Sequence, residues 1–227
     1  MQKKNLEIDT ILFDLDGTLV DSILDIKLAL NYMLAIFKLP TLSTNTLKGI
    51  IGRGLPTTVM ETLNLYIKDK ERVNKIHKKA LELTLQSYNN IHGEQTKVYP
   101  SVIKTLHNLK EHGYKMAIVT NKEVNEAKSL LKKLQMLHFF PVVIGGNSTK
   151  HYKPHQAPIE EAISQLKSSK QKSIMIGDSI TDINAANNAG IPSICVSYGY
   201  HANKINITKT IDNIKELEHL LDINNYE

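Results

Sequence analysis

The most constraining feature of this sequence is a pair of aspartates that follows a short apolar run. Residues 11–13 read Ile-Leu-Phe, which predicts a buried strand, and Gly17 is typical of the point where a strand has ended. Side chains two apart on a strand share a face, so Asp14 and Asp16 should leave its end in roughly the same direction. Because two adjacent carboxylates repel each other, the pattern predicts either a bound cation or a division into one ionised and one protonatable group.

The chain has 227 residues, of which 41% are hydrophobic, enough for one large domain or for a main domain with a smaller companion. Its single cysteine, Cys195, lies in the apolar run 194–196 and is interpreted as a buried thiol, which fits a reducing cytoplasm. The first strand follows Met1 too closely for a signal peptide, and no apolar run reaches membrane-spanning length. We therefore expect a cytoplasmic protein without a membrane partner.

The formal net charge of +5 raises the question of a nucleic-acid partner. Of the 28 basic residues, Arg53 and Arg72 are arginines, which leaves 28 − 2 = 26 lysines. These lysines are spread along the chain without blocks or interleaved aromatic residues, whereas a nucleic-acid footprint normally needs clustered charge. The charge pattern therefore predicts no nucleic-acid partner.

The spacing of hydrophobic residues differs between two parts of the chain. Between Asp21 and His92 the apolar residues recur at helical spacing, with Ser43 and Asp69 as candidate N-caps, and no strand is expected. The helices are expected at 23–38, 42–51, 56–67 and 69–90. This predicts an all-helical insert over 21–92. The insert interrupts a single core domain, which is made of residues 1–20 and 93–227.

After residue 98, short apolar strands alternate with amphipathic helices. Strands are expected at 115–120, 142–144, 172–176 and 193–196, and helices at 101–112, 122–136, 156–167, 181–189 and 213–221. Uncharged strands that alternate with helices are typical of a parallel sheet covered on both faces. The fold class predicted is therefore α/β, a doubly wound parallel sheet with a Rossmann-like core and an inserted helical cap subdomain.

In such sheets, ligands bind outside the carboxyl ends of the strands. Polar residues lie at this edge at the ends of the first four expected strands or in the loops after them: Asp14 and Asp16, Thr120 and Asn121, Lys153, and Asp178 with Asp182. Three carboxylates that converge with a lysine and a hydroxyl suit a hard divalent cation and an anion. Mg²⁺ bound by Asp14 and Asp178, with Asp182 nearby, and a small phosphorylated metabolite are therefore expected.

Four segments of the chain carry a family resemblance: DLDGTLVDS at 14–22, VTNK at 119–122, Lys153-Pro154, and GDSITD at 177–182. In this order they resemble the four motifs of haloacid dehalogenase superfamily phosphatases. Within that superfamily the chain is most similar to the phosphoglycolate phosphatases, because of Lys-Pro-His at 153–155, Tyr-Gly-Tyr at 198–200 and a helical cap after the first motif.

The resemblance implies a role for each site residue. Asp14 would be the nucleophile that forms an aspartyl-phosphate, and Asp16 the general acid and base. Thr120 and Lys153 would hold the phosphoryl oxygens, with Asn121 as a further substrate-binding residue. The metal ligands would be Asp14, the backbone carbonyl of Asp16, and Asp178. Asp182 would orient Lys153 or a metal-bound water.

The cap would choose the leaving group, and Arg53 is the candidate residue for that choice. It lies between two glycines in the expected cap loop, and a guanidinium group matches a carboxylate well. This favours a small acidic leaving group, such as glycolate from 2-phosphoglycolate. A pyrophosphatase, a nucleotide or sugar-phosphate phosphatase, a phosphosugar mutase and a non-catalytic binding protein on the same fold all stay open, and the chain is expected to be a monomer or a homodimer.

Overall fold

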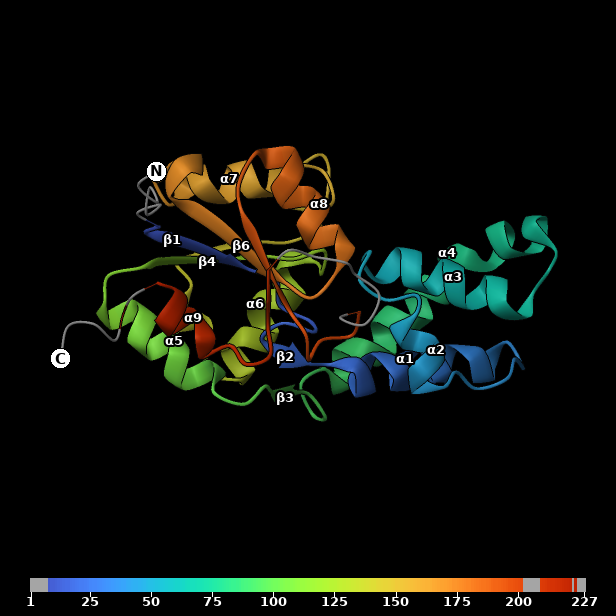
Figure 1. Ribbon diagram of the computed structural model, residues 1–227. Coiled ribbons are helices and arrows are strands. Elements are labelled where there is room, and N and C mark those ends of the chain that lie inside the picture. Colours follow the sequence, from blue (N-terminus) through green and yellow to red (C-terminus); the bar gives the residue numbers. More distant parts are fainter. Residues whose placement is uncertain (1–7, 202–208, 222, 224–227) are drawn as a thin grey trace.

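The computed structural model describes residues 8–201, 209–221 and 223. Within these residues, six strands form one parallel sheet in the order β5-β4-β1-β6-β7-β8, which confirms the predicted fold class (Figure 1). The strands are β1 (Thr10–Phe13), β4 (Lys115–Val119), β5 (Val142–Ile144), β6 (Ser173–Gly177), β7 (Ser193–Val196) and β8 (Thr210–Ile211).

The register of the sheet aligns the strand ends that carry the motifs. The last residue of β1, Phe13, lies opposite Ile118 of β4 on one side and Ile176 of β6 on the other. The chain that follows β1 therefore emerges beside the ends of both neighbouring strands. This alignment places the first, second and fourth motifs at one edge of the sheet, as expected for ligand sites in parallel sheets.

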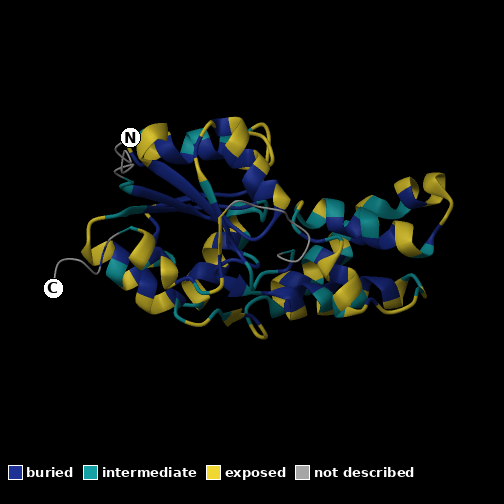
Figure 2. Ribbon diagram, viewed as in Figure 1, coloured by how far each residue is buried: buried dark blue, intermediate teal, exposed yellow. Residues whose placement is uncertain are grey.

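Helices cover both faces of the sheet (Figures 1 and 2). One face packs against α5 (Val102–Glu111), α6 (Val124–Lys133) and α9 (Glu216–Leu220), and the other against α7 (Ala157–Gln165) and α8 (Ile180–Ala189). Residues of β1 alternate between the two clusters, with Ile11 and Phe13 in the first and Leu12 in the second. A strand buried on both faces reads as a continuous apolar run, which is how β1 appears in the sequence.

Four helices form a unit beyond the carboxyl edge of the sheet (Figure 1): α1 (Ile23–Ile36), α2 (Thr44–Lys48), α3 (Leu55–Tyr66) and α4 (Lys70–Ile91). They share a hydrophobic cluster that is separate from the two clusters of the sheet and includes Tyr200 from the loop after β7. Ser43 and Asp69 accept hydrogen bonds from the first turns of α2 and α4, so both predicted N-caps are confirmed.

The sequence did not predict three of the strands, namely β2 (Val20–Asp21), β3 (Lys97–Val98) and β8. Of these, β2 and β3 form a small antiparallel ribbon where the chain enters and leaves the helical unit. Each of the three has two residues, too few to show a hydrophobic period. Two short 3₁₀ helices, η1 (Leu137–Phe139) and η2 (Lys170–Lys172), precede β5 and β6. Among the described helices, none combines the length and apolar character needed to cross a membrane.

A buried aspartate ties together the entry to and the exit from the helical unit. Asp25 in the first turn of α1 is fully buried and accepts hydrogen bonds from the backbone N–H groups of Gly93, Gln95 and Thr96 at 2.8–3.1 Å and from the Thr96 hydroxyl at 2.6 Å. A carboxylate that accepts several hydrogen bonds compensates well for its burial. Asp25 therefore fixes where the helical unit joins the core.

We expect Asp25→Ala to lower the free energy of unfolding by about 3 kcal/mol, because it leaves buried donors without an acceptor. Asp69→Ala is the matched control, since Asp69 caps α4 at an exposed position and its loss should cost about 1 kcal/mol. Urea unfolding of both variants measures the difference. Equal losses in the two variants would contradict this role of Asp25.

Candidate active site

The carboxyl edge of the sheet gathers the motif residues. The backbone N–H of Asp14 donates to Ile176 of β6, and that of Thr120 donates to Ile144 of β5, both at 2.9 Å. The sheet ladder thus continues through Asp14 and Thr120, and the register places Thr120 and Asp178 one residue further along the strand direction than Asp14. All three side chains are buried.

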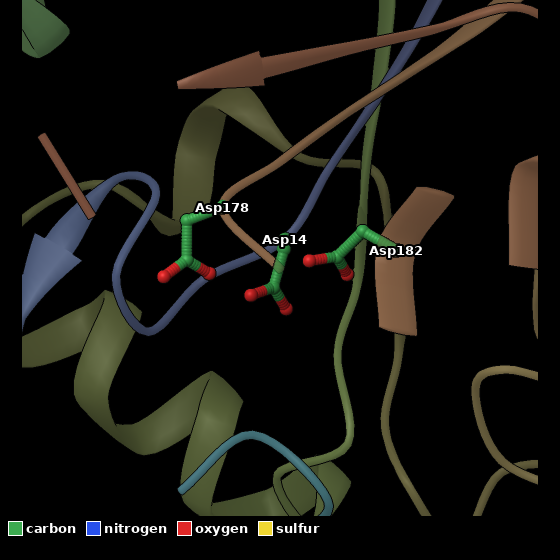
Figure 3. A group of neighbouring side chains, drawn as sticks. All are labelled: Asp14, Asp178 and Asp182. Carbon is green, nitrogen blue, oxygen red and sulfur yellow. The ribbon is translucent and has the colours of Figure 1, made fainter. Parts of the chain in front are cut away.

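Three buried carboxylates meet at this edge (Figure 3). Each of Asp14, Asp178 and Asp182 offers an oxygen, and these oxygens all lie within 4.8 Å of one another. Burial raises the pKa of Asp14 to about 7, with Lys153 opposing the rise and the other two aspartates adding to it. Burial likewise raises the pKa of Asp178 above its usual range, against the effect of His201. The cluster therefore favours a cation among its oxygens.

Lys153 lies between two of these carboxylates. Its Nζ donates to Asp14 Oδ1 at 2.9 Å and to Asp182 Oδ1 at 2.6 Å, and its side chain is 2% exposed. Burial lowers the pKa of Lys153, but Asp14 and Asp182 outweigh that effect and raise it above the usual range. Asp182 is itself fixed, because its Oδ2 accepts from the backbone N–H and the hydroxyl of Ser179, the capping box of α8.

The second aspartate of the first motif has different partners. Asp16 accepts hydrogen bonds from the hydroxyl of Ser22 and, at 2.8 Å, from Nζ of Lys122. Lys122 is buried, and its Nζ lies 5.0 Å from the ring centroid of Tyr88 on α4. Asp14 and Asp16 are therefore held by different lysines, from the loops after β5 and β4 respectively.

Glycines make the close packing around Asp178 possible. Gly17 has a φ of +90°, and a Cβ atom there would collide with the Asp178 carboxylate. A Cβ at Gly199 would collide with Asp178 from the other side, and the backbone N–H of Tyr200 donates to Asp178 Oδ2 at 2.7 Å. The loops after β1 and β7 therefore enclose this carboxylate with backbone rather than with side chains.

A cavity of about 60 Å³ lies between this edge and the helical unit. From the core it is lined by Asp14, Asp16, Thr120, Asn121, Lys122, Glu126, Asp178, Ser179, Tyr200 and His201, and from the helical unit and its loop mainly by Ile51, Gly52, Leu55, Thr58 and Tyr88. Asn121 spans the boundary, because its amide donates to Gly52 O at 3.1 Å and Lys153 O at 3.0 Å.

The structure brings together every predicted site residue except Arg53. Arg53 lines a neighbouring cavity, forms an ion pair with Glu61 of α3, and has a side chain that is 54% exposed. The sequence analysis missed Lys122, Tyr88 and Tyr200 as site residues. Lys122 could have been predicted, because it lies two residues after Thr120 at a strand end. Tyr88 could not, because it lies within an ordinary amphipathic helix.

The charges of the site fit a divalent cation. Asp14, Asp16, Glu126, Asp178 and Asp182 face the two ammonium groups of Lys122 and Lys153. Five carboxylates against two cations leave about three negative charges at the site when all are ionised. Oxygen ligands of this kind suit Mg²⁺, which is usually held by one or two carboxylates together with substrate oxygens and waters. Asp14 and Asp178 are the better candidates for direct ligands, because both oxygens of Asp182 already accept hydrogen bonds.

The site combines a buried acidic cluster with two lysines, and it lies between the carboxyl edge of a doubly wound sheet and a helical unit. This combination is suited to a hydrolase that acts on an anionic ester. Comparison with known families places the chain more closely. The model of the haloacid dehalogenase-like hydrolases matches residues 11–196, and the chain belongs to this family.

Relatives and solved structures agree with this assignment. The chain is 33% identical over 217 residues to a phosphoglycolate phosphatase of Nitrosococcus oceani, covering 94% of this chain and 96% of the relative. It is 36% identical to a phosphoglycolate phosphatase of Colwellia psychrerythraea, covering 86% and 87%. A predicted phosphoglycolate phosphatase from Haemophilus somnus superposes with a TM-score of 0.82 at 28% identity, covering 94% of this chain and 98% of that one.

We expect Mg²⁺, well above its dissociation constant, to raise the melting temperature by about 5 °C, because it binds the folded cluster and not the unfolded chain. Asp178→Asn should lose this shift. Its melting temperature without metal should be equal to or above that of the wild type, since one of three mutually repelling carboxylates is gone. Thermal unfolding with and without Mg²⁺ measures both effects. Asp69→Asn, at an exposed cap, should keep the shift; an undiminished shift in Asp178→Asn would contradict the assignment.

Proposed function

We propose that this protein is an Mg²⁺-dependent phosphatase that hydrolyses a small phosphate monoester, 2-phosphoglycolate in particular, through an aspartyl-phosphate intermediate. The observation that carries the proposal is the arrangement of Asp14. One of its oxygens accepts from the buried ammonium group of Lys153, and its carboxylate lines the cavity beside Asp16 and Thr120. A fixed carboxylate that faces a cavity with cations around it is suited to attack phosphorus.

The reaction would proceed in two displacements. A carboxylate oxygen of Asp14 bonds to phosphorus while the bond from phosphorus to the leaving oxygen breaks, and protonated Asp16 gives its proton to that oxygen. Water then attacks phosphorus, Asp16 takes a proton from it, and the bond from phosphorus to Asp14 breaks. Inorganic phosphate leaves, and Asp14 is again a carboxylate and Asp16 again an acid.

Other residues would position and neutralise the phosphoryl group. Lys153 and the Thr120 hydroxyl would bind its oxygens and offset the charge that spreads over them. Asp14, Asp178 and the backbone carbonyl of Asp16 would hold Mg²⁺, which supplies further neutralisation of that charge. Asp182 would keep Lys153 in place, a role supported by their separation of 2.6 Å.

Two findings support a small acidic substrate. Relatives at 33–36% identity are named phosphoglycolate phosphatases. The cavity also presents the ammonium group of Lys122, which can offset a negative charge on the leaving group. We infer that residues 21–92 act as a cap, because side chains of this unit line the side of the cavity opposite Asp14.

We expect Asp14→Asn to abolish hydrolysis of every phosphate ester, with a loss of at least about 10⁴-fold, because an amide cannot replace the attacking carboxylate. The variant should stay folded, since it removes charge from a crowded acidic cluster. Turnover and circular dichroism measure the two properties. Asp69→Asn is the control for loss of a carboxylate outside the site, and wild-type turnover in Asp14→Asn would refute the mechanism.

We expect 2-phosphoglycolate to be the best substrate in a panel that includes pyrophosphate, a nucleoside monophosphate and a hexose phosphate. Phosphate release in the presence of Mg²⁺ measures the preference. Activity should disappear after treatment with a chelator and return with Mg²⁺, because the buried carboxylates need a counter-cation. Faster hydrolysis of pyrophosphate or of a sugar phosphate would show that 2-phosphoglycolate is not the preferred substrate. Undiminished turnover without metal would contradict the metal requirement.

A further inference from the structure

A substrate with a second negative charge requires a positive group in the cavity besides those that hold the phosphoryl group. Among the described residues that line the cavity, Lys122 is the one lysine or arginine, whereas the imidazole of His201 faces Asp178 at 3.6 Å. Arg53 lines a different cavity, and its guanidinium group is paired with Glu61. The side chain of Lys122 is 6% exposed, and its hydrogen bond to Asp16 at 2.8 Å uses one of the three protons on its ammonium group.

Tyr88 supplies a second, independent observation. Its side chain is 1% exposed and lines the same cavity, and its buried hydroxyl lies beside the Lys122 ammonium group with no acceptor for its own proton. An unpaired buried hydroxyl normally costs free energy, so such a group is most often completed by a ligand or a water. Burial also raises the pKa of Tyr88 to about 12, so its hydroxyl keeps its proton and can donate.

The two donors lie together although they come from different parts of the chain. Lys122 follows β4 in the core, whereas Tyr88 belongs to α4 in the helical unit, and the ammonium group lies 5.0 Å from the tyrosine ring centroid. A carboxylate has two oxygens and can accept from an ammonium group and a hydroxyl at once. The pair is therefore matched to a carboxylate that enters between core and helical unit.

Asp16 sets the length of the leaving group that fits. Asp16 would protonate the leaving oxygen, and Lys122 contacts the same aspartate. The carboxylate that reaches Lys122 must therefore be close to the leaving oxygen along the substrate. A carboxylate on the carbon atom that bears this oxygen meets the requirement with the fewest intervening bonds.

We propose that Lys122 and Tyr88 form the subsite for the leaving group's carboxylate, and that they select phosphate esters whose carboxylate is attached to the carbon bearing the phosphate. This inference rests on the proposed phosphatase function and names the residues that set its specificity. The subsite spans the boundary between core and cap, so the carboxylate would draw the two parts together as it binds.

The test compares 2-phosphoglycolate with ethyl phosphate, which has a similar size but no carboxylate. We expect Tyr88→Phe to lower the ratio of the two kcat/KM values about tenfold and Lys122→Met to lower it about a hundredfold, as expected for hydrogen bonds to a charged group. The loss in Tyr88→Phe should fall mainly on KM for 2-phosphoglycolate. Lys122→Met removes a hydrogen-bond donor to Asp16. Tyr88→Phe keeps the test valid, because the Tyr88 hydroxyl makes no hydrogen bond to Asp16.

Controls separate this proposal from its alternatives. Tyr32→Phe removes the hydroxyl of an exposed tyrosine on α1 and should leave the ratio unchanged. A fall in the ratio for Arg53→Met, with no change in the Lys122 and Tyr88 variants, would assign the selection to Arg53 and overturn the proposal. Phosphoethanolamine carries an ammonium group in place of the carboxylate. Faster turnover of phosphoethanolamine than of ethyl phosphate would overturn the proposal too, because the acidic residues of the cavity would then select a positively charged leaving group.

The two levels of the hypothesis fail in different ways. A wild-type protein that hydrolyses neither ester with Mg²⁺ would refute the proposed function together with the subsite. A wild-type protein that prefers 2-phosphoglycolate, combined with unchanged ratios in both variants, would refute the subsite alone.

Discussion

The ammonium group of Lys153 lies between two carboxylates that would repel each other without it, and the rest of the site is arranged around this contact. Asp14 follows β1, Asp182 lies in the first turn of α8, and Lys153 comes from the loop after β5. Charges buried this deeply are stable only when each has a partner. The three segments are therefore constrained to meet at the proposed phosphoryl subsite.

A second ion pair gives Asp16 a different environment from Asp14. Its partner Lys122 contacts Tyr88 of the helical unit, whereas the ion pairs of Lys153 are with two carboxylates of the core, Asp14 and Asp182. The residue proposed as nucleophile is thus fixed within the core, and the residue proposed as acid and base lies where core and cap meet. Recognition of the leaving group and proton transfer to it can then depend on the same boundary.

Much of this arrangement was predictable, because it follows from local rules. The apolar run before Asp14 predicted a buried strand, and the carboxyl ends of parallel strands predicted where Asp14, Thr120 and Asp178 would gather. The caps at Ser43 and Asp69 were predicted from residue type and position. Asp25 was not, because an aspartate in the first turn of a helix is ordinary, and its hydrogen bonds to residues 93–96 join segments about seventy positions apart.

By itself, the sequence determined the α/β fold class, the helical insert and the identity of the strand-end residues, since these depend on hydrophobic period and on residue types within a few positions of one another. Tertiary structure alone decided which cation faces the cavity. Arg53 is conspicuous in the sequence, yet its guanidinium group pairs with Glu61 outside the cavity, whereas Lys122 is one of many lysines and is buried beside Asp16 and Tyr88. The physical reason is that side-chain direction and burial across the boundary between core and cap arise from packing between distant segments, which no local pattern records.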